Sequence, residues 1–413
     1  MFFYLSFLRT PPHSMSNDLR TDPFPSNVDI FYWWISGTTQ NLTKLSEPTK
    51  LTTWRRENAY KPMQIPPPSK SVVGASGIDC TLVLSTMPDV ASSVIDLSDP
   101  EIGRVPLPVY SLPIRICPQR GHGAAAANMP SPLTGKQEAI TRPFRLFGRD
   151  ATAPLMQIKE AVSFDLDKKL WDSGIGLSAW LVRLSALDVS GLAASLSQPT
   201  IVHELKERLF SGRQGCHIIE LGAGTGIVSL VLAALRSANL ASSVPPDEPC
   251  SILSTDLREL ARRLTLRTPP FVASSMELMS HNIRTNVMLY PHCPPTGLPL
   301  DWDEELPLTV RNFRDHGGFD IVVMADVTYN TSSFPALLRT LSSLLALSAH
   351  HRRDGARKDE REPLVLLAYK ERDPAERQVW EMMARETGVM LECVGKHAGG
   401  GGLPVEIWLG RRR

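Results

Sequence analysis

Four residues, Glu220, Gly222, Gly224 and Gly226, have the types and spacing of a nucleotide-binding turn. They form the stretch ELGAGTG, which lies between the apolar run HIIEL and the longer apolar run IVSLVLAALR. Because glycine has no side chain, its backbone can pass close to a ligand. The pattern therefore indicates a strand, a tight turn and a helix that together bind part of a nucleotide.

The spacing of the glycines distinguishes between the common nucleotides. A dinucleotide site needs G-x-G-x-x-G, and the third glycine counted from Gly222 would fall at Ile227. A phosphate-binding P-loop ends in Gly-Lys-Ser/Thr, and this turn contains no lysine. The pattern acid-x-G-x-G-x-G instead favours S-adenosylmethionine, with Glu220 orienting one end of the cofactor. A tight strand-to-helix bend that binds no ligand is the alternative.

Asp256 ends the next apolar run, SILSTD. At the carboxyl edge of a sheet, its carboxylate could hydrogen-bond both hydroxyls of a ribose. The separation from Gly222 is longer than the usual ~20 residues, and the inserted Pro-rich loop at 237–250 accounts for the excess. An N-cap for a helix that begins at LRELARR is an equally good interpretation of Asp256.

The composition is that of a globular chain without a broad electrostatic preference. The 413 residues are 42% hydrophobic, and 44 basic against 43 acidic residues leave a formal net charge of +1. This balance gives no general attraction for nucleic acid or anionic lipid. The opening MFFYLSFL lacks the basic region of a signal peptide, and no run of about 18 apolar residues is present. We expect no membrane partner.

The six cysteines are far apart in the sequence. They lie at positions 80, 117, 216, 250, 293 and 393, with no Cys-x-x-Cys pair and no cluster at zinc-ligand spacing. We expect six free thiols, no metal, and a reducing compartment: the cytoplasm, with the nucleus as an alternative.

From about Thr141 to the C-terminus, apolar strands alternate with amphipathic helices. We expect strands at HIIEL, SILSTD, FDIVVMAD and PLVLLAYK, and helices at LWDSGIGLSAWLVRL, IVSLVLAALR, MELMSHNIRTNV, PALLRTLSSLLAL and AERQVWEMMARE. Two further strands, MLECVG and VEIWLG, are joined by a connection too short for a helical crossover, so we expect one antiparallel strand at the end of the sheet. The prediction is an α/β fold with a Rossmann-like, mostly parallel sheet and helices on both faces.

Residues 1–140 differ from the rest in being rich in proline and serine. We expect an N-terminal extension that is partly disordered, followed by one domain at 141–413. Within the extension, CTLVLSTM and VPLPVYSLPIRI could pair as strands, whereas residues 121–136 are of low complexity. A second, charged loop at 350–362 reads as a solvated surface segment.

From about Thr141 to Leu409 the chain resembles the family-16 group of class I, or seven-β-strand, methyltransferases, most of which are protein-lysine methyltransferases. The resemblance is carried by LWDSGIGLSAWL, ELGAGTGIVSL, STD, LDW followed by acidic residues, and MADVTYN. The Asp-x-x-Tyr of MADVTYN is the most specific of these. The resemblance implies a seven-stranded sheet, S-adenosylmethionine as cofactor, and a soluble intracellular protein as substrate, such as a chaperone-like protein or a member of a multiprotein complex.

The resemblance also implies site residues. The implied cofactor contacts are Trp171, Gly222, Ala223, Gly224, Asp256, Trp302 and Ala325, and the turn adds Glu220 and Gly226. Asp256 would take the ribose and Trp302 would lie beside the adenine, although tryptophans are often packing residues. Asn282 matches an asparagine common in the family, and we interpret it as structural. The long extension, the two inserted loops and Asn330 depart from the family pattern, which leaves the substrate open.

Asp326 and Tyr329 are the predicted catalytic residues. Methyl transfer needs a neutral nitrogen that is aligned with the methyl carbon. We interpret Asp326 as accepting one amine N–H so that the lone pair faces the methyl group, and Tyr329 as a wall of the lysine channel. The amine proton could leave to water or to Asp326. A helix cap is the alternative role for Asp326.

Two other functions stay open at this point. The acceptor could be a small amine or a nucleic acid, although no stripe of basic and aromatic residues supports nucleic-acid binding. The chain could instead be a scaffold that holds a partner through residues 1–140, since a fold alone does not establish chemistry.

Overall fold

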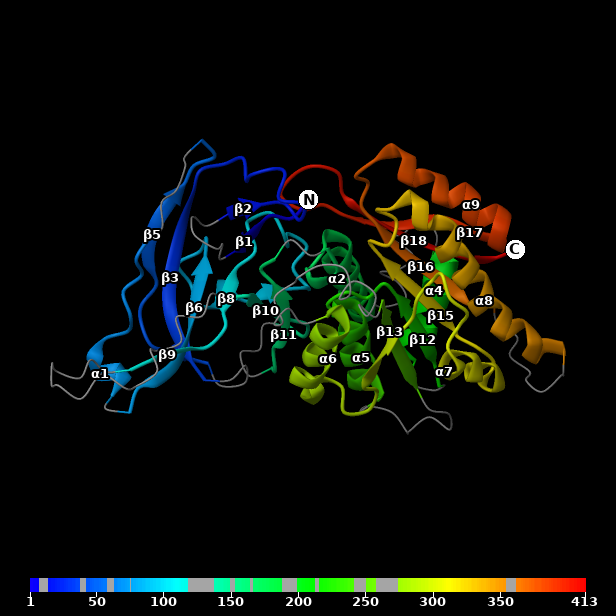
Figure 1. Cartoon of the computed structure of the whole chain (residues 1–413), viewed down its shortest axis with the longest axis horizontal. Helices are drawn as coiled ribbons and strands as arrows, with labels where there is room; N and C mark the ends of the chain where they lie inside the picture. Colours follow the sequence, from blue (N-terminus) through cyan, green and yellow to red (C-terminus); the bar gives the residue numbers. More distant parts are fainter. Residues whose placement is uncertain are drawn as a thin grey trace, which may run out of the picture. The chain divides into compact units, whose positions relative to one another are not determined.

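The structure is a computed structural model, and it divides into two compact units, Met1–Lys169 and Leu170–Arg413 (Figure 1). It describes residues 1–6, 14–37, 42–57, 63–74, 76–117, 137–148, 153–163, 166–187, 199–211, 215–240, 250–257, 274–353 and 362–413. None of the helices in these ranges is both long and apolar enough to cross a bilayer.

The second unit contains a seven-stranded sheet in the order β14-β13-β12-β15-β16-β18-β17. Its strands are β12 (His217–Leu221), β13 (Ser251–Asp256), β14 (Pro295–Pro299), β15 (Ile321–Ala325), β16 (Leu364–Tyr369), β17 (Val389–His397) and β18 (Val405–Arg412). The pairs from β14 to β16 are parallel, whereas β18 runs antiparallel to both β16 and β17. The predicted α/β fold is confirmed, and the antiparallel strand lies between β16 and β17 and not at the sheet edge.

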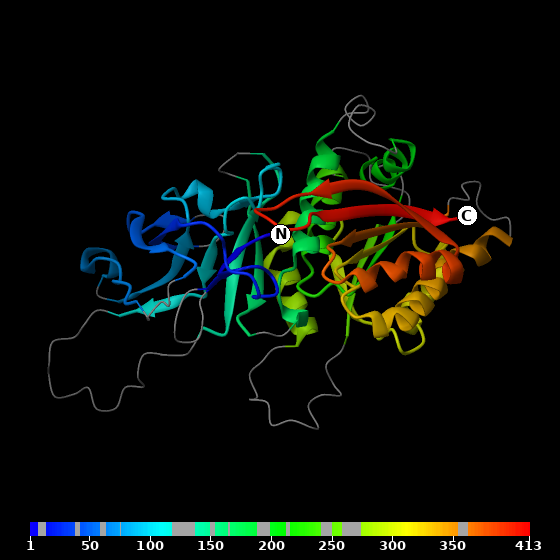
Figure 2. The same ribbon diagram turned by 90° about the horizontal axis from the view of Figure 1, so that it is seen from above.

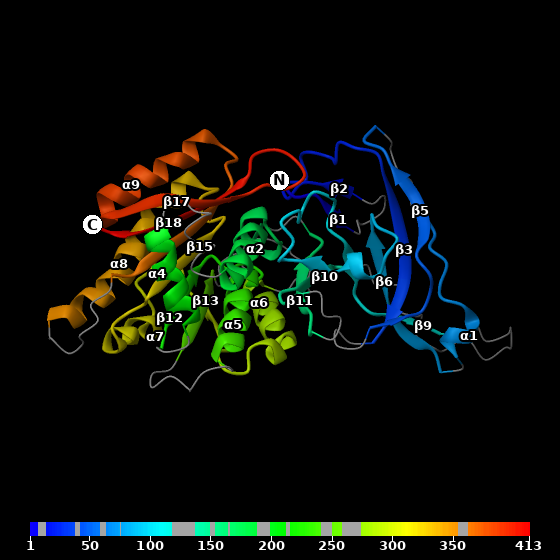
Figure 3. The same ribbon diagram turned by 180° about the vertical axis from the view of Figure 1, so that it is seen from behind.

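Helices cover both faces of this sheet. They are α2 (Asp172–Ala186), α4 (Pro199–Phe210), α5 (Ile227–Leu240), α6 (Ser275–Thr285), α7 (Leu308–Arg311), α8 (Phe334–Arg353) and α9 (Gln378–Thr387). One face packs on α8 and α9 through a large apolar cluster that includes Leu221, Met324, Leu341 and Met383. The other face carries α2, α5 and α6, drawn in green and yellow-green (Figures 2 and 3). Because both faces are covered, the central strands β12, β15 and β16 are buried along almost their whole length and are mostly apolar.

Two glycines let α2 approach its neighbours closely. A Cβ at Gly174 would lie 3.2 Å from Ile227 Cγ2 of α5, and one at Gly176 would lie 2.9 Å from Val405 of β18. The close packing brings the first turn of α2 to the carboxyl ends of β15 and β16, where Ser173 and Asp172 make hydrogen bonds to Asp326 and Lys370. The fold thereby positions α2 at the edge where the site is expected.

The expected helices and strands between residues 170 and 413 are present, with boundaries shifted by a few residues. Among the α-helices and strands of this part of the described chain, α4, α7 and β14 were not predicted. The sequence of β14 is PTGLP, and proline and glycine are poor strand residues except at sheet edges. Since β14 is the edge strand, it tolerates both proline residues at its ends.

The first unit is built mainly of antiparallel strands. They are β1 (Tyr4–Ser6), β2 (Ser14–Ser16), β3 (Val28–Ser36), β4 (Thr43–Lys44), β5 (Thr49–Trp54), β6 (Ile78–Ser85), β7 (Ile95–Asp96), β8 (Val109–Ser111), β9 (Ile114–Ile116), β10 (Ala139–Arg145) and β11 (Met156–Ala161), with a single-turn helix α1 (Lys70–Val73). β6 pairs with β8 and β9, which confirms the expected pairing of CTLVLSTM with VPLPVYSLPIRI. The unit has its own apolar core, which includes Phe3, Ile30, Leu84 and Ile140.

The N-terminal part of the chain is thus a folded β unit over its described residues, where the sequence suggested a partly disordered extension. The boundary also lies later, at Lys169/Leu170 and not near residue 140. The reason is that β10 and β11 pair with each other and β10 also pairs with β8. The low-complexity stretch at 121–136 lies outside the described residues.

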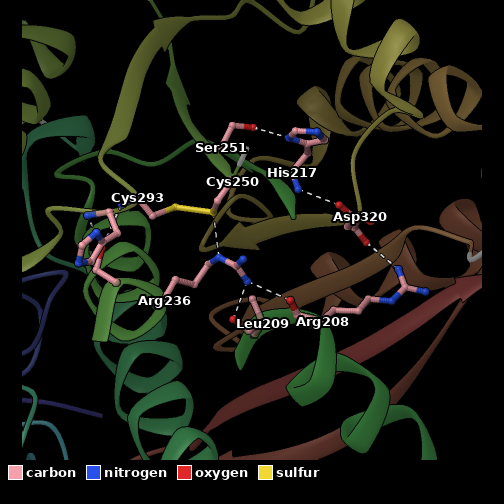
Figure 4. Close-up of a disulfide and its surroundings, with 10 residues drawn as sticks. Arg208, Leu209, His217, Arg236, Cys250, Ser251, Cys293 and Asp320 are labelled. Carbon is pink, nitrogen blue, oxygen red and sulfur yellow. Dashed lines mark hydrogen bonds between the residues drawn. A yellow bond between two sulfur atoms is a disulfide. The ribbon is translucent and has the colours of Figure 1, made fainter. Parts of the chain in front are cut away.

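The expectation of six free thiols is wrong for Cys250 and Cys293, which form a disulfide with a Cα–Cα distance of 6.0 Å (Figure 4). Cys250 directly precedes β13, and Cys293 lies two residues before β14. The two strands are parallel neighbours whose pairing begins with Ile252 and Pro295. The bond therefore joins the starts of two adjacent strands. Arg236 donates a hydrogen bond of 2.9 Å from Nε to Cys250 Sγ.

This pairing predicts the number of titratable thiols. In denaturant without reductant, a thiol reagent should titrate Cys80, Cys117, Cys216 and Cys393, and all six cysteines after reduction. In the Cys293→Ser variant, the thiol reagent should titrate all remaining cysteines in denaturant without any reductant. Because the bond closes a loop of 43 residues, its removal should lower the free energy of unfolding by about 2–4 kcal/mol. Six titratable thiols in the unreduced chain would contradict the pairing.

Candidate functional site

The glycine turn joins β12 to α5 and has a backbone that requires glycine. Gly222, Gly224 and Gly226 have φ values of +67°, +54° and +83°, a region that side chains rarely adopt. The Gly226 N–H donates to the Ala223 carbonyl at 2.8 Å and closes the turn. The alternating glycines therefore serve the conformation of the turn itself.

Neighbouring strands and helices hold the turn at the carboxyl edge of the sheet. The Gly224 N–H donates to Asp256 Oδ2 at 2.6 Å, and the Ala223 N–H donates to the Thr255 carbonyl at 2.9 Å. From α6, the buried side chain of Asn282 donates to the Thr225 carbonyl at 2.9 Å. Asn282, interpreted from the sequence as structural, is thus a direct support of the turn.

Asp256 lies beside the turn, as its predicted role requires. Its Oδ1 accepts the Leu257 N–H at 2.7 Å while Oδ2 accepts the Gly224 N–H. A carboxylate oxygen can accept more than one hydrogen bond, which the predicted ribose role requires. The alternative helix cap concerns residues 258–273, which lie outside the described residues. The ribose role stays a prediction.

Trp302 and Val327 border the space above Gly222. A Cβ at Gly222 would lie 2.8 Å from Val327 Cγ1 and 3.4 Å from the ring of Trp302. Trp302 follows β14 and is partly buried. The ring of Trp302 and the nearby Asp256 carboxylate are groups that fit a nucleoside-like cofactor. Val327 and Trp302 form a cradle over Gly222 that leaves no room for a side chain at this position.

Glu220 has a different position from the one expected. Its carboxylate lies in the interior and accepts hydrogen bonds from the N–H and the hydroxyl of Ser229, in the first turn of α5. A carboxylate at a helix N-terminus is favoured by the helix dipole. Burial raises the pKa of Glu220 to about 7. The structure therefore assigns this carboxylate to joining β12 to α5.

Asp326 directly follows β15 and is almost fully buried. Its φ is +59°, an uncommon conformation for a residue other than glycine. Arg372 Nη1 donates to its Oδ1 at 2.6 Å, and the Ser173 N–H of α2 donates to its Oδ2 at 3.1 Å. The structure thus brings Asp326 to the same edge as the turn, within a network that joins β15, β16 and α2.

The remaining predicted site residues are Trp171, Ala325 and Tyr329. Trp171 is the N-cap of α2, and its ring centroid is 5.1 Å from the Arg372 guanidinium carbon. Ala325 ends β15 and pairs with Ala368 of β16. Tyr329 is 56% exposed, so its side chain is accessible to a substrate. These placements leave each predicted role as a prediction.

Arg372 is the residue that the sequence reading missed. It lies three residues beyond the end of β16, in the segment YKERD. A charged segment at the carboxyl end of an apolar strand was the available signal, since ligand sites in open α/β sheets lie at that edge.

Comparison with known proteins identifies a family that the chain matches. Residues 151–386 match the family model described as lysine methyltransferase. Protein N-lysine methyltransferase METTL21A of Danio rerio is 31% identical over 131 residues, which cover 32% of this chain and 45% of the relative. METTL21A of Mus musculus is 31% identical over 133 residues, with the same two shares. The chain spans about half the length of the curated relatives it matches.

A solved structure of a magnesium protoporphyrin IX methyltransferase from Synechocystis PCC 6803 with bound SAM is 14% identical. The aligned region covers 57% of this chain and 84% of the Synechocystis methyltransferase chain, with a TM-score of 0.30.

The cradle at Gly222 predicts the effect of a methyl group there. Gly222→Ala should weaken the binding of S-adenosylhomocysteine at least tenfold in calorimetry, because the new Cβ would push Val327 and meet Trp302. Gly74→Ala is a matched control, since Gly74 has a φ of +63° but no atom within 4 Å of the added Cβ. Equal affinities for the two variants would contradict the cradle.

The buried Glu220 carboxyl predicts a pH dependence. Its pKa is raised from 4.5 to about 7 by burial, so the stabilisation from its protonated form is complete below about pH 4.5 and is lost as the pH rises through 7. In Glu220→Gln the side chain does not ionise, so the variant does not lose this stability as the pH rises. The free energy of unfolding of the variant relative to wild type should therefore rise by on the order of 3 kcal/mol between pH 4.5 and 8 in urea titrations. A constant difference would rule out the raised pKa.

Proposed function

The chain belongs to the lysine methyltransferase family, and on this premise we propose that it transfers methyl groups from S-adenosylmethionine to a lysine side chain of a protein. S-adenosylmethionine is the cofactor of this family, as the glycine turn predicted. One observation carries the proposal. Val327, the neighbour of Asp326, has its Cγ1 2.8 Å from the position of a Gly222 Cβ, so the turn and the carboxylate share one edge of the sheet.

We assign the activity to the unit Leu170–Arg413, which contains the whole predicted site. In the proposal, the Gly222–Gly226 turn takes the methionyl and ribose parts of the cofactor, Asp256 accepts from the ribose hydroxyls, and Trp302 lies beside the adenine. The hydrogen bonds from Gly224 to Asp256 and from Asn282 to Thr225 support this assignment, because they hold the turn in one conformation.

The bound cofactor supplies a methyl group on a positively charged sulfur. A lysine amine can attack it only in its neutral form, and at pH 7 a free lysine is neutral only about once in 2,500 molecules. Reaching that form costs about 4.6 kcal/mol, part of which an apolar channel and the sulfonium charge offset by disfavouring the ammonium. The exposed ring of Tyr329 is the proposed wall of that channel.

Asp326 is the proposed group that aims the amine. Its oxygens accept from Arg372 and Ser173 and retain lone pairs for an amine N–H. As the amine lone pair forms the N–C bond, the C–S bond breaks and the sulfur keeps its electron pair. The product is a methylated ammonium and S-adenosylhomocysteine, so atoms and charge balance.

The substrate is proposed to be a chaperone-like protein or a member of a multiprotein complex in the cytoplasm, with the nucleus as the alternative. The Cys250–Cys293 bond removes the premise of six free thiols on which the reducing compartment rested. The proposed location therefore no longer has the support of the cysteines.

The proposed acceptor can be tested by labelling. Lysate from cells that lack the chain is incubated with the purified chain and tritiated S-adenosylmethionine. The label should survive nuclease and dialysis, disappear with protease, and appear as methyl-lysine in mass spectrometry. Label destroyed by nuclease would favour a nucleic-acid acceptor, and label lost on dialysis would favour a small amine.

Asp326→Asn should lower the rate of methyl transfer by about 100-fold or more, because the amine loses the charged acceptor that aims it. Binding of S-adenosylhomocysteine should change little. Asp303→Asn is the matched control, since Asp303 is exposed and pairs with Arg339 on the surface. An Asp326→Asn chain with wild-type activity would end the proposed mechanism, and one that lacks activity but restores the cellular function would favour a scaffold.

A further inference from the structure

Arg372 forms an ion pair with Asp326, the carboxylate that aims the amine in the proposed reaction. Its side chain is only 11% exposed, and its Nη1 lies 2.6 Å from Asp326 Oδ1. The guanidinium also lies against the ring of Trp171 at 5.1 Å. A planar guanidinium held by a carboxylate on one atom and a ring on its face has a defined position.

A second positive group faces the other oxygen of Asp326. The Ser173 N–H lies in the first turn of α2, a helix of 15 residues. The N-terminus of a helix carries a partial positive charge, which favours a carboxylate. Asp326 is therefore held between a full positive charge and a partial one, with a backbone conformation that aims it at both. Strained conformations of this kind concentrate at functional sites.

The other charged groups near this pair largely balance among themselves. Lys370, directly after β16, pairs with Asp172 of α2, and both side chains are buried. Arg377 pairs with Glu371 and Glu406. Glu376 accepts a hydrogen bond from the backbone N–H of Arg372 at 3.4 Å, and burial, the largest cause, raises the pKa of Glu376. Among the described residues around Asp326, Arg372 is the cation that contacts its carboxylate.

A carboxylate beside an amine has two opposite effects on methyl transfer. It aims the nitrogen through a hydrogen bond, but its negative charge also stabilises the ammonium form, which cannot attack. A partner cation on the carboxylate removes most of the second effect, while free lone pairs on each oxygen preserve the first. The pair Asp326–Arg372 has this arrangement.

We propose that Arg372 is a positioning residue that fixes the Asp326 carboxylate and balances its charge, so that the target amine reaches the methyl carbon in its neutral form. The inference rests on the proposed function. The amine proton is then released to water before attack, because the paired carboxylate is a poor base, and the neutral nitrogen forms the N–C bond as the C–S bond breaks.

The first test is the pH dependence of methyl transfer in two variants. Arg372→Gln keeps a hydrogen-bond donor but loses the charge, whereas Arg372→Lys keeps the charge. Incorporation of tritium from S-adenosylmethionine into protein of a lysate that lacks the chain is followed from about pH 6.5 to 9.5. The acidic limb should move up by about one pH unit or more in Arg372→Gln, and return towards the wild-type position in Arg372→Lys.

The second test does not depend on activity. S-adenosylmethionine carries the sulfonium charge and S-adenosylhomocysteine does not. A carboxylate without its arginine should favour the charged ligand, so calorimetry of Arg372→Gln should show the ratio of the two dissociation constants shifted about tenfold towards S-adenosylmethionine. A purely structural role would weaken both ligands together and leave the ratio unchanged.

Arg377→Met is the matched control, because Arg377 is in the adjoining segment but pairs with Glu371 and Glu406. It should keep the wild-type pH profile and ligand ratio. An Arg372→Gln variant that keeps both would overturn the inference, as would loss of ligand binding in both Arg372 variants, since Arg372 would then hold the fold and not the charge. A wild-type chain that labels no protein would overturn the proposed function, and the inference with it.

Discussion

The ion pair between Asp326 and Arg372 is the interaction on which the rest of the site depends. A buried carboxylate is costly unless it is paired and hydrogen-bonded, and breaking such a pair costs about 3–5 kcal/mol. Asp326 meets this requirement with partners from two distant segments, Arg372 after β16 and the Ser173 N–H of α2. One carboxylate thus joins the ends of two strands to the helix that precedes the sheet, and the same carboxylate is placed for chemistry.

On the cofactor side of the site, too, the residues that hold the fold are the predicted functional residues. The hydrogen bonds that hold the glycine turn involve Asp256 and Asn282, and both side chains lie at the edge where a nucleoside would bind. Val327 connects the two halves, since it packs against the space above Gly222 and is bonded to Asp326. The glycine turn and the carboxylate are therefore joined through one residue.

The sheet of the second unit was largely predictable because its elements carry strong periodic signals. HIIEL, SILSTD and FDIVVMAD are short apolar runs that end in turn or acidic residues, and they form β12, β13 and β15. β14 escaped prediction because an edge strand tolerates the proline and glycine that usually mark a loop. Most of the β unit of residues 1–169 escaped prediction because its strands are separated by proline- and serine-rich segments, and their pairing is set by partners distant in the sequence.

The sequence by itself determined the α/β alternation, the glycine turn and the position of Asp326 after a strand, since each depends on residues that are neighbours in the chain. Only the tertiary structure decided that Arg372 pairs with Asp326, that Glu220 serves α5, and that Cys250 lies beside Cys293. These contacts join residues that are 46, 9 and 43 positions apart, and side-chain direction decides each of them. Spacing along a chain specifies periodicity, but the direction of a side chain follows from the packing of whole elements.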